Sequence, residues 1–350
     1  MISVRRILEQ KQIKVSAPCR IDAGGTWDIK AMALPFESIL PVTVNIALNL
    51  RTYVHILPFE EGHIKILSEG FGEKVFSSSS LSFEPPYGLF IAAVRFFDFH
   101  GLEIRISSSS PVQSGLGGSS TALVALIKAL SEIRRLLDGK EMDSNQILFL
   151  SYHIEDAISG GNCGAQDQGA AVFGGVNKWI WRYSKPYICE RVPLLDKKRQ
   201  SELSEHILVL YTGEKHSSSA INRGWINDFL TGKTQKEWIE ANRIVHEFAD
   251  ALRQMNIKKA IECLNREVEI REKITPDAFT PLTKQLIKQA QQIGASARFA
   301  GAGAGGSIWA LAEKKDITTL FQAWQKTISH VTDARILSCS LDPEGLIVHD

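Results

Sequence analysis

The chain has 350 residues, of which 44% are hydrophobic and 23% charged, and its formal net charge is +1. This composition is typical of a soluble globular protein with room for about two domains. Acidic and basic residues are interleaved, so we expect neither a nucleic-acid nor a membrane partner. The five cysteines are scattered without CxxC spacing, which argues against a disulfide framework or a structural zinc site and favours a cytoplasmic protein. No apolar run is long enough to span a bilayer.

In the first half of the chain, strand-like segments come before helical ones. Alternating or apolar patterns predict strands, with a bulge before Tyr53, at 13–22, 42–50, 63–67 and 102–108. Helical spacing predicts helices at 118–137 and 145–159, the second capped by residues 143–145. A further strand at 176–183 would place three aromatic residues on one face: Trp179, Trp181 and Tyr183.

The charged stretch 195–206 is the best candidate for a domain junction, and we therefore divide the chain into residues 1–195 and 196–350. After it, strands are predicted at 207–211, 295–300, 307–312 and 334–341. Helices are predicted at 235–254, 257–273 and 281–293, and after Asp316. This mixture of elements predicts an α+β protein with two sandwich-like domains rather than a regular βαβ winding.

The segment 111–121, PVQSGLGGSST, joins a predicted strand to a predicted helix. It is neither a Walker loop, because Ser119 stands where the lysine is needed, nor a dinucleotide fingerprint, because Ser120 replaces the third glycine. Glycines still let backbone amides approach an anion, and a helix start adds free N–H groups. Hydroxyls that could join them, or bind a metal ion, belong to Ser114, Ser119, Ser120 and Thr121. The alternative is an ordinary helix start with serine caps.

A second stretch, 160–175, holds one carboxylate, Asp167, among glycines and the amides of Gln166 and Gln168. Small neighbours leave space for a ligand, so Asp167 could accept a proton from an attacking hydroxyl. An Asx turn in a glycine-rich loop is the alternative. Glu155 precedes Asp167 by twelve residues on a predicted helix and could hold a magnesium ion near it.

Two more stretches have the composition of binding sites. Residues 17–28, APCRIDAGGTWD, combine Arg20 with the acids Asp22 and Asp28 and with Trp27, a set that suits a polyol, although a salt-bridged strand end is the alternative. Residues 299–307, FAGAGAGGS, match G-x-G-x-x-G, but a strand follows and no acid stands about twenty residues on. We expect a backbone loop that closes over a ligand.

In this combination and order the stretches resemble the GHMP kinase family, named for galactokinase, homoserine kinase, mevalonate kinase and phosphomevalonate kinase. Its AP-x-R/K motif resembles residues 17–20, and its P-x-x-x-G-L-G-S-S-A motif resembles 111–120, with Gly118 and Ser120 in place of serine and alanine. Its GAGGGG loop resembles 301–306, with Ala304 in place of one glycine. Residues 153–177 further resemble the sugar-kinase branch of D-glycero-D-manno-heptose 7-phosphate kinase, L-fucokinase and galactokinase, whose heptose and fucose members phosphorylate the anomeric hydroxyl.

The resemblance implies a two-domain fold, with an N-terminal domain like ribosomal protein S5 domain 2 and a ferredoxin-like C-terminal domain. It implies that Asp167 and Arg20 are catalytic and that Ser119 and Glu155 hold Mg²⁺. The ATP phosphates would be bound by Pro111, Ser114, Gly115, Leu116, Gly117, Gly118, Ser119, Ser120 and Thr121. The expected substrate contacts are Asp28, Trp27, Gly164 and Gly303. Between Arg20 and Asp28 the chain is one residue shorter than the family's R-I-x-F-x-G-G-x-x-D segment.

The resemblance implies an ATP- and Mg²⁺-dependent sugar kinase that acts as a monomer or homodimer on a sugar or sugar phosphate, at the C1 hydroxyl. For a phosphorylated substrate, the candidate cations are Lys30, Lys215 and Arg223. The segment 212–222 resembles a sugar-site segment of the same branch, with His216 and Ser217–Ser219 as possible contacts. The alternatives are an inactive, ligand-sensing relative and a diphosphate decarboxylase. The presence of Arg20, Ser119, Glu155 and Asp167 together favours the enzyme.

Overall fold

Strand β2 (Val42–Pro58) is the longest strand of the first half of the chain and pairs with three others. It runs antiparallel to β1 (Ile13–Ala23), β5 (Leu102–Ser108) and β6 (Val176–Trp181). The computed structural model describes residues 4–215 and 219–349. In it the first sheet has the order β12-β1-β2-β5-β3-β4, with β6 and β7 branching from β2. The outer strands are β3 (His63–Ser68), β4 (Gly72–Ser77), β7 (Cys189–Pro193) and β12 (Ile347–His349).

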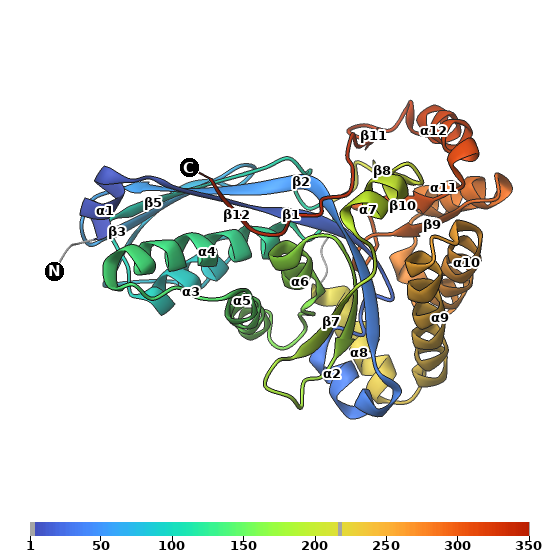
Figure 1. The fold of residues 1–350 in the computed structure, drawn as a ribbon, viewed down its shortest axis with the longest axis horizontal. Helices are drawn as coiled ribbons and strands as arrows, with labels where there is room; N and C mark the ends of the chain where they lie inside the picture. Colours follow the sequence, from blue (N-terminus) through green and yellow to red (C-terminus); the bar gives the residue numbers. More distant parts are fainter. Residues whose placement is uncertain (1–3, 216–218, 350) are drawn as a thin grey trace.

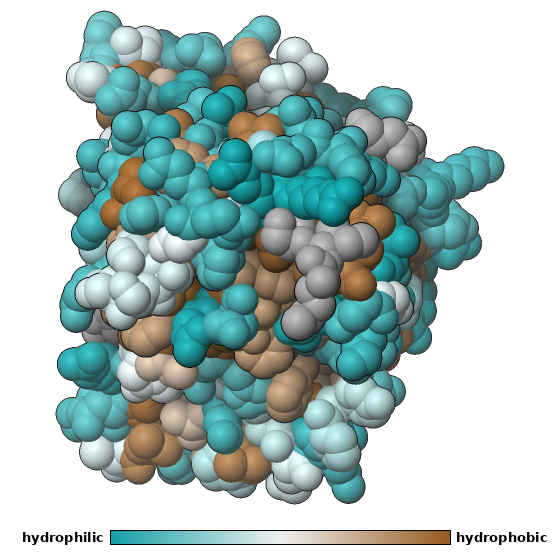
Figure 2. All heavy atoms as spheres, turned by 90° about the vertical axis from the view of Figure 1, so that its left-hand side faces the viewer, coloured by the Kyte–Doolittle hydropathy of each residue, from teal (hydrophilic) through white to brown (hydrophobic). Residues whose placement is uncertain are grey.

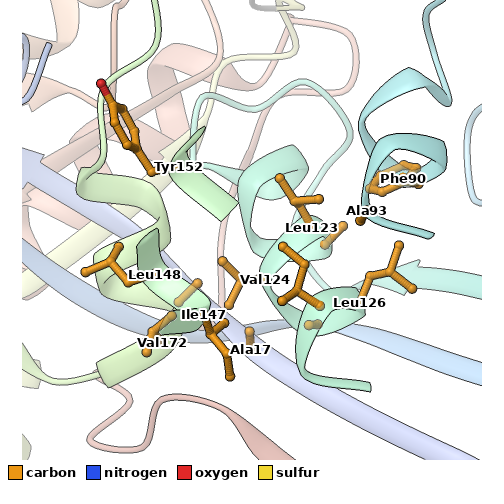
Figure 3. Packing of buried hydrophobic residues seen from close by; sticks show 14 of the residues in the cluster. Ala17, Phe90, Ala93, Leu123, Val124, Leu126, Ile147, Leu148, Tyr152 and Val172 are labelled. Atoms are coloured by element: carbon orange, nitrogen blue, oxygen red, sulfur yellow. The ribbon is translucent and has the colours of Figure 1, made fainter. Parts of the chain in front are cut away.

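Helices cover one face of this sheet (Figure 1). The central one is α4 (Gly118–Asp138), which is apolar on most of its surface because β1, β2 and neighbouring helices surround it. Figure 3 shows its side chains between those of its two flanking helices, with Phe90 on one side and Leu148 on the other. The helices of this layer are α1 (Val4–Gln10), α3 (Gly88–Phe97), α5 (Ser144–Ile158) and α6 (Gln166–Phe173).

The second half of the chain builds a smaller sheet of four antiparallel strands in the order β11-β8-β10-β9. These are β8 (Ile207–Tyr211), β9 (Ser296–Phe299), β10 (Ser307–Leu311) and β11 (Arg335–Ile336). Its helices are α9 (Gln235–Arg253), α10 (Ile257–Ile274), α11 (Pro281–Gln292) and α12 (Lys314–Ile328). One apolar cluster joins the sheets, since Ile21 and Val44 belong to it together with Trp309.

The remaining helices connect these layers. They are the short α2 (Lys30–Ala33), the 3-10 turns η1 (Leu34–Ile39) and η2 (Pro276–Ala278), α7 (Lys197–Ser204) and α8 (Ser219–Leu230). Helix α7 lies in the charged stretch that we took as the domain junction. The division at residue 195 remains a proposal, and β12 complicates it, because the last strand leaves the second half and pairs with β1.

Most predicted elements are confirmed, and the misses have physical reasons. The bulge before Tyr53 is present, since Pro18 pairs with Arg51 whereas Cys19 pairs with Leu48. The tryptophan strand is confirmed too, with the rings of Trp179 and Trp181 stacked 6.1 Å apart. The strand predicted at 334–341 is reduced to the two residues of β11. Several helices and strands were not predicted: α1, α2, α3, α6, α7, α8, β4, β7 and β12. Helix α3 is apolar almost all round, so it has no clear period, and β12 is short and paired only at long range.

Within residues 4–215 and 219–349, no helix combines the length and the apolar character needed to cross a membrane. Hydrophilic side chains cover most of the face shown in Figure 2, with hydrophobic side chains between them, several of which lie together near its centre.

Candidate functional site

The loop between β5 and α4 is built from backbone conformations that favour glycine. Gly115 and Gly117 have φ angles of 74° and 81°, and Gln113 has a φ of 56°. Gly117 is the N-cap residue of α4 and offers no side-chain cap, so the first amides of the helix remain available to a ligand. The predicted sequence of strand, glycine loop and helix is therefore confirmed.

This loop lines a cavity of about 420 Å³, within the usual range for ligand pockets. Most of the residues predicted to bind phosphate line it: Pro111, Ser114, Gly115, Gly117, Gly118, Ser119 and Ser120. Leu116 and Thr121 do not. Leu116 is buried and its carbonyl accepts a hydrogen bond from the Arg20 amide at 3.1 Å, while the Thr121 hydroxyl donates to the Gly117 carbonyl at 2.8 Å. Both residues support the loop from behind.

Arg20 and Asp167 form an ion pair at the floor of the cavity. The guanidinium Nε and Nη2 atoms lie 2.7 and 2.6 Å from Asp167 Oδ1, and Nη1 donates to the Gly115 carbonyl at 2.8 Å. Both contacts to the carboxylate use Oδ1, so Oδ2 keeps its capacity to accept a proton. A Cβ on Gly117 would lie only 2.9 Å from Oδ2, which places this oxygen against the phosphate loop. The pairing predicted from the resemblance thus exists in the structure.

Asp28 lies near this pair and also lines the cavity. Its oxygens accept hydrogen bonds from the backbone amides of Thr26, at 2.9 Å, and Gln166, at 3.2 Å. Burial and the charge of Asp167 raise the pKa of Asp28 from 3.8 to about 6. Gly164 packs against the carboxylate so closely that a Cβ there would lie 1.7 Å from Oδ2. Asp28 and Gly164 are therefore neighbours, as predicted for two substrate contacts.

Glu155 reaches the cavity from α5. Burial, with the charge of Asp167, raises its pKa from 4.5 to about 7, although hydrogen bonds from Ser120 and Gln168 act in the opposite direction. The Gln168 Nε2 donor lies 2.6 Å from Glu155 Oε2. Ser120 thus contacts Glu155 directly, while Ser119, the other predicted magnesium ligand, is exposed on the first turn of α4.

The donor set fits Mg²⁺ only together with a bound phosphate. In the described part of the chain there is no group of three or more His, Cys, Asp or Glu side chains that could hold a metal ion. Mg²⁺ is commonly held by one or two carboxylates, waters and the oxygens of a phosphate substrate. Glu155 with the hydroxyls of Ser119 and Ser120 beside a phosphate loop meets that description, and the unfavourable burial of its carboxylate is what a cation would relieve.

The glycine loop of the second half closes against the phosphate loop. The Gly301 amide donates to Asp22 Oδ1 at 2.7 Å, and Gly301 lines the cavity. A Cβ on Gly306 would lie 2.7 Å from the Ser114 carbonyl, so only glycine allows this approach. Arg298, fully buried, lies 3.0 Å from both Asp22 and Glu267 and so joins β1 to β9 and α10.

Two predicted substrate contacts, Trp27 and Gly303, do not line this cavity. Trp27 is fully buried outside the cavity: its ring packs edge-on against Phe229 and Trp238, and its Nε1 donates to the Trp238 carbonyl at 3.1 Å. Gly303 does not line the cavity either, because it packs against Ala278, where a Cβ would lie 2.5 Å from the carbonyl oxygen. Residues 216–218, which include the predicted contact His216, lie outside the described residues.

One end of the cavity is formed by residues that were not predicted as site residues. Its apolar wall consists of Phe71, Pro86, Tyr87 and Phe90, near the hydroxyls of Ser68 and Ser108. Tyr87 is held by hydrogen bonds from its hydroxyl to the carbonyls of Phe71 and Gly72 at 3.0 and 2.9 Å. In sequence these residues cannot be told from core residues. The side chains of Asn162 and Asn222, which also line the cavity, were missed as well.

The structure therefore has a cavity between a glycine loop at a helix start and an Arg–Asp pair, an arrangement that suits a ligand with phosphate groups. Comparison with known proteins makes the class more specific. Residues 87–175 match the GHMP kinases N terminal domain. The chain is 27% identical to the mevalonate kinase of Pyrococcus horikoshii, over 76% of this chain and 81% of that protein. It is also 27% identical to the D-glycero-alpha-D-manno-heptose 7-phosphate kinase of Campylobacter jejuni, over 92% of this chain and 96% of that protein.

Among solved structures, a D-glycero-D-manno-heptose 1-phosphate kinase from Bacteriodes thetaiotaomicron is similar, with a TM-score of 0.73 at 20% identity, covering 97% of this chain and 99% of that one. This similarity confirms the predicted fold, the mixed α+β fold of the GHMP kinases. Residues 87–175 carry the GHMP kinase N-terminal domain, and over most of its length the chain is similar in sequence to kinases that act on mevalonate or on a heptose phosphate.

Proposed function

We propose that the protein is an ATP-dependent kinase that transfers the γ-phosphoryl group to a sugar hydroxyl, at the anomeric C1 position. The observation that carries this proposal is the Arg20–Asp167 pair, whose free Oδ2 lies against the phosphate loop at Gly117. A proton acceptor beside a phosphate cradle is the arrangement that phosphoryl transfer to a hydroxyl needs. The kinase names of the relatives support the same class.

In the proposed reaction each part of the cavity has one task. The amides of the phosphate loop and the start of α4 hold the β- and γ-phosphates of ATP. The apolar wall around Tyr87 receives its adenine ring. Asp28 accepts hydrogen bonds from sugar hydroxyls and holds the acceptor near Asp167. Asp167 Oδ2 takes the proton of the attacking hydroxyl, the hydroxyl oxygen bonds to the γ-phosphorus, and the bond to the β–γ bridging oxygen breaks, which releases ADP.

Arg20 and Glu155 support this step without taking part in bond making. Arg20 fixes Asp167 through Oδ1 and reduces the negative charge that the incoming phosphoryl group meets. Glu155 and Ser119 would hold Mg²⁺, which would neutralise charge on the phosphates when bound, while Ser120 donates a hydrogen bond to Glu155. An anomeric hydroxyl is more acidic than an ordinary alcohol, so a carboxylate is a sufficient base for it.

The proposal is tested by following ADP release with MgATP and a panel of hexoses and heptoses. We expect turnover of at least one sugar, with a product whose phosphorus is coupled to the C1 proton in NMR. Binding of MgATP without turnover of any sugar would favour the alternative, an inactive ligand-sensing relative.

The roles of Ser119 and Ser120, the two serines at the start of α4, should be separable by substitution. Removing the Ser119 hydroxyl should raise the KM for MgATP by about tenfold, the value of one charge-assisted hydrogen bond. Ser120→Ala should instead move the acidic limb of the pH–rate profile upward, because the Ser120 hydrogen bond holds the pKa of Glu155 down. If both variants shifted the same limb equally, the separate roles would be refuted.

Gly164→Ala should impair the acceptor site and leave the nucleotide site intact. A Cβ at this position would lie 1.7 Å from Asp28 Oδ2, so Asp28 must move. We expect the sugar KM to rise by about tenfold or more, while the KM for MgATP stays unchanged. Gly224→Ala is the control for the added side chain alone, since Gly224 is exposed, has open space around it and has no positive φ.

A further inference from the structure

The acceptor end of the cavity is anionic. Asp28 and Asp167 both line it, and Arg20 is the one cationic residue among the described residues that line the cavity. We propose that the acceptor is an uncharged sugar, without a phosphate or carboxylate group, and that Asp28 is the residue that excludes charged acceptors. This inference rests on the proposed function and narrows it, since the sequence left open whether the substrate is already phosphorylated.

The charge of Arg20 is already balanced by protein groups. Its guanidinium lies 2.6 Å from Asp167 and 3.6 Å from Asp22, and it donates to the Gly115 carbonyl at 2.8 Å. Its side chain is 5% exposed. A phosphate ester on the acceptor would have to displace one of these carboxylates to gain the guanidinium, and would leave that carboxylate buried and unpaired.

None of the other cationic side chains that the structure describes in this region lines the cavity. The candidates for binding a substrate phosphate, Lys30, Lys215 and Arg223, are exposed, and none of them lines the cavity. Arg298 is fully buried between Asp22 and Glu267. Arg271 is also fully buried: it donates to the Gly25 carbonyl at 3.0 Å, with Trp238 and Trp225 against its guanidinium.

Neutral polar groups occupy the positions that cations would need. Thr26, Asn162, Gln166 and Asn222 line the cavity around Asp28 and offer hydroxyl and amide groups. The Gln166 Oε1 atom is buried and has no hydrogen-bond partner among the described residues. Each Asp28 oxygen accepts one backbone amide, from Thr26 or Gln166, and retains a lone pair. These oxygens can accept hydrogen bonds from sugar hydroxyls, which are donors. Phosphate oxygens can only accept hydrogen bonds, and their negative charge is repelled by Asp28.

The test compares each free sugar with its own terminal phosphate ester, with the 7-phosphate of D-glycero-α-D-manno-heptose included as one ester. For the unaltered protein with MgATP we expect kcat/KM for the free sugar to exceed that for its ester by about 100-fold or more. The ester should also fail to inhibit turnover of the free sugar. In the Asp28→Asn variant the ratio of kcat/KM for the free sugar to that for the ester should fall. The free sugar loses a hydrogen-bond partner, whereas the ester is no longer repelled by the carboxylate charge.

Asp228→Asn, which alters an exposed carboxylate outside the cavity, is the matched control and should leave the ratio unchanged. Turnover of the ester equal to or better than that of the free sugar would overturn this inference and leave the proposed kinase function standing. If MgATP binds but neither member of any pair is phosphorylated, the proposed function itself fails. An unchanged ratio in a folded Asp28→Asn protein would remove Asp28 from its assigned role.

Discussion

Asp167→Asn should lower kcat by about 10³-fold, within the range that positioned proton acceptors contribute. The substitution keeps the shape of the side chain, and the asparagine Oδ1 can still accept from Nε and Nη2 of Arg20, as Asp167 Oδ1 does at 2.7 and 2.6 Å. Only the second oxygen changes, from a proton acceptor to an amide donor. The loss should therefore appear in kcat, with the dissociation constant for MgATP changed by no more than about twofold.

The measurement is steady-state ADP release combined with calorimetric titration of MgATP on the same preparation. Asp228→Asn serves here too as the control, since this carboxylate pairs with Lys233 at 2.8 Å away from the cavity. A folded Asp167→Asn protein that turns over at a near-normal rate would show that Asp167 is not the proton acceptor. In that case Asp28, the other carboxylate of the acceptor end, becomes the next candidate.

Local patterns made the phosphate loop predictable from sequence. The strand at 102–108, the glycines and the helix from 118 adjoin one another, so periodicity and glycine spacing are sufficient. The Arg20–Asp167 pair is different, because its members are 147 residues apart. Only the resemblance to a family joined them, and composition alone left an Asx turn as an equal alternative.

The structure also revises the local setting of Asp167, which lies in the first turn of α6 instead of a glycine loop. The glycines of GAQDQGAAVF suggested a loop, but Gly169 lies inside the helix, where a Cβ would meet the Trp179 ring at 2.9 Å. Glycine is needed there for close packing on β6. A sequence does not reveal such a requirement, because the partner strand is what creates it.

Trp27 was misassigned for a related reason. A tryptophan among glycines and acids is typical of a sugar site, yet here its partners are Phe229 and Trp238, which are distant in sequence. Phe229 belongs to α8, a helix that was not predicted. The apolar wall at Tyr87 could not be assigned at all, since its residues have the same composition as the core. The fold decides whether such a residue faces a cavity, and the residue type does not reveal it.

Glu155→Gln should stabilise the ligand-free protein while impairing the reaction. Burial and the charge of Asp167 raise the pKa of Glu155 from 4.5 to about 7. A carboxyl whose pKa is raised by folding binds its proton more tightly in the native state, so stability falls as the pH rises from about 4.5 to 7 and the cost is complete above that range. At pH 8 the ionised side chain therefore costs about 1–3 kcal/mol of the free energy of unfolding.

A glutamine avoids that cost and fits the same space. Gln168 now donates to Glu155 Oε2 at 2.6 Å, and its own Oε1 is buried without a partner among the described residues. Rotation of the Gln168 amide would offer that oxygen to the new amide at residue 155. Without ligands at pH 8 we expect a higher unfolding temperature than for the unaltered protein, and the difference should vanish near pH 5. The same variant should lose about 10²-fold in Mg²⁺-dependent kcat/KM if Glu155 holds the metal ion.

Thermal unfolding across pH 5 to 8, with and without MgATP, separates the two effects. The control is Glu141→Gln, which removes an exposed carboxylate that pairs with Lys128 outside the cavity and should leave the pH dependence unchanged. A loss of stability at every pH would mean that Glu155 is a structural residue held by Ser120 and Gln168. A stabilised variant that turns over normally would show that the cation is held elsewhere. If Glu155→Gln is more stable at pH 8 and less active, the Glu155 carboxylate is destabilising when ionised in the free protein. Its role is then to bind the cation that arrives with the nucleotide.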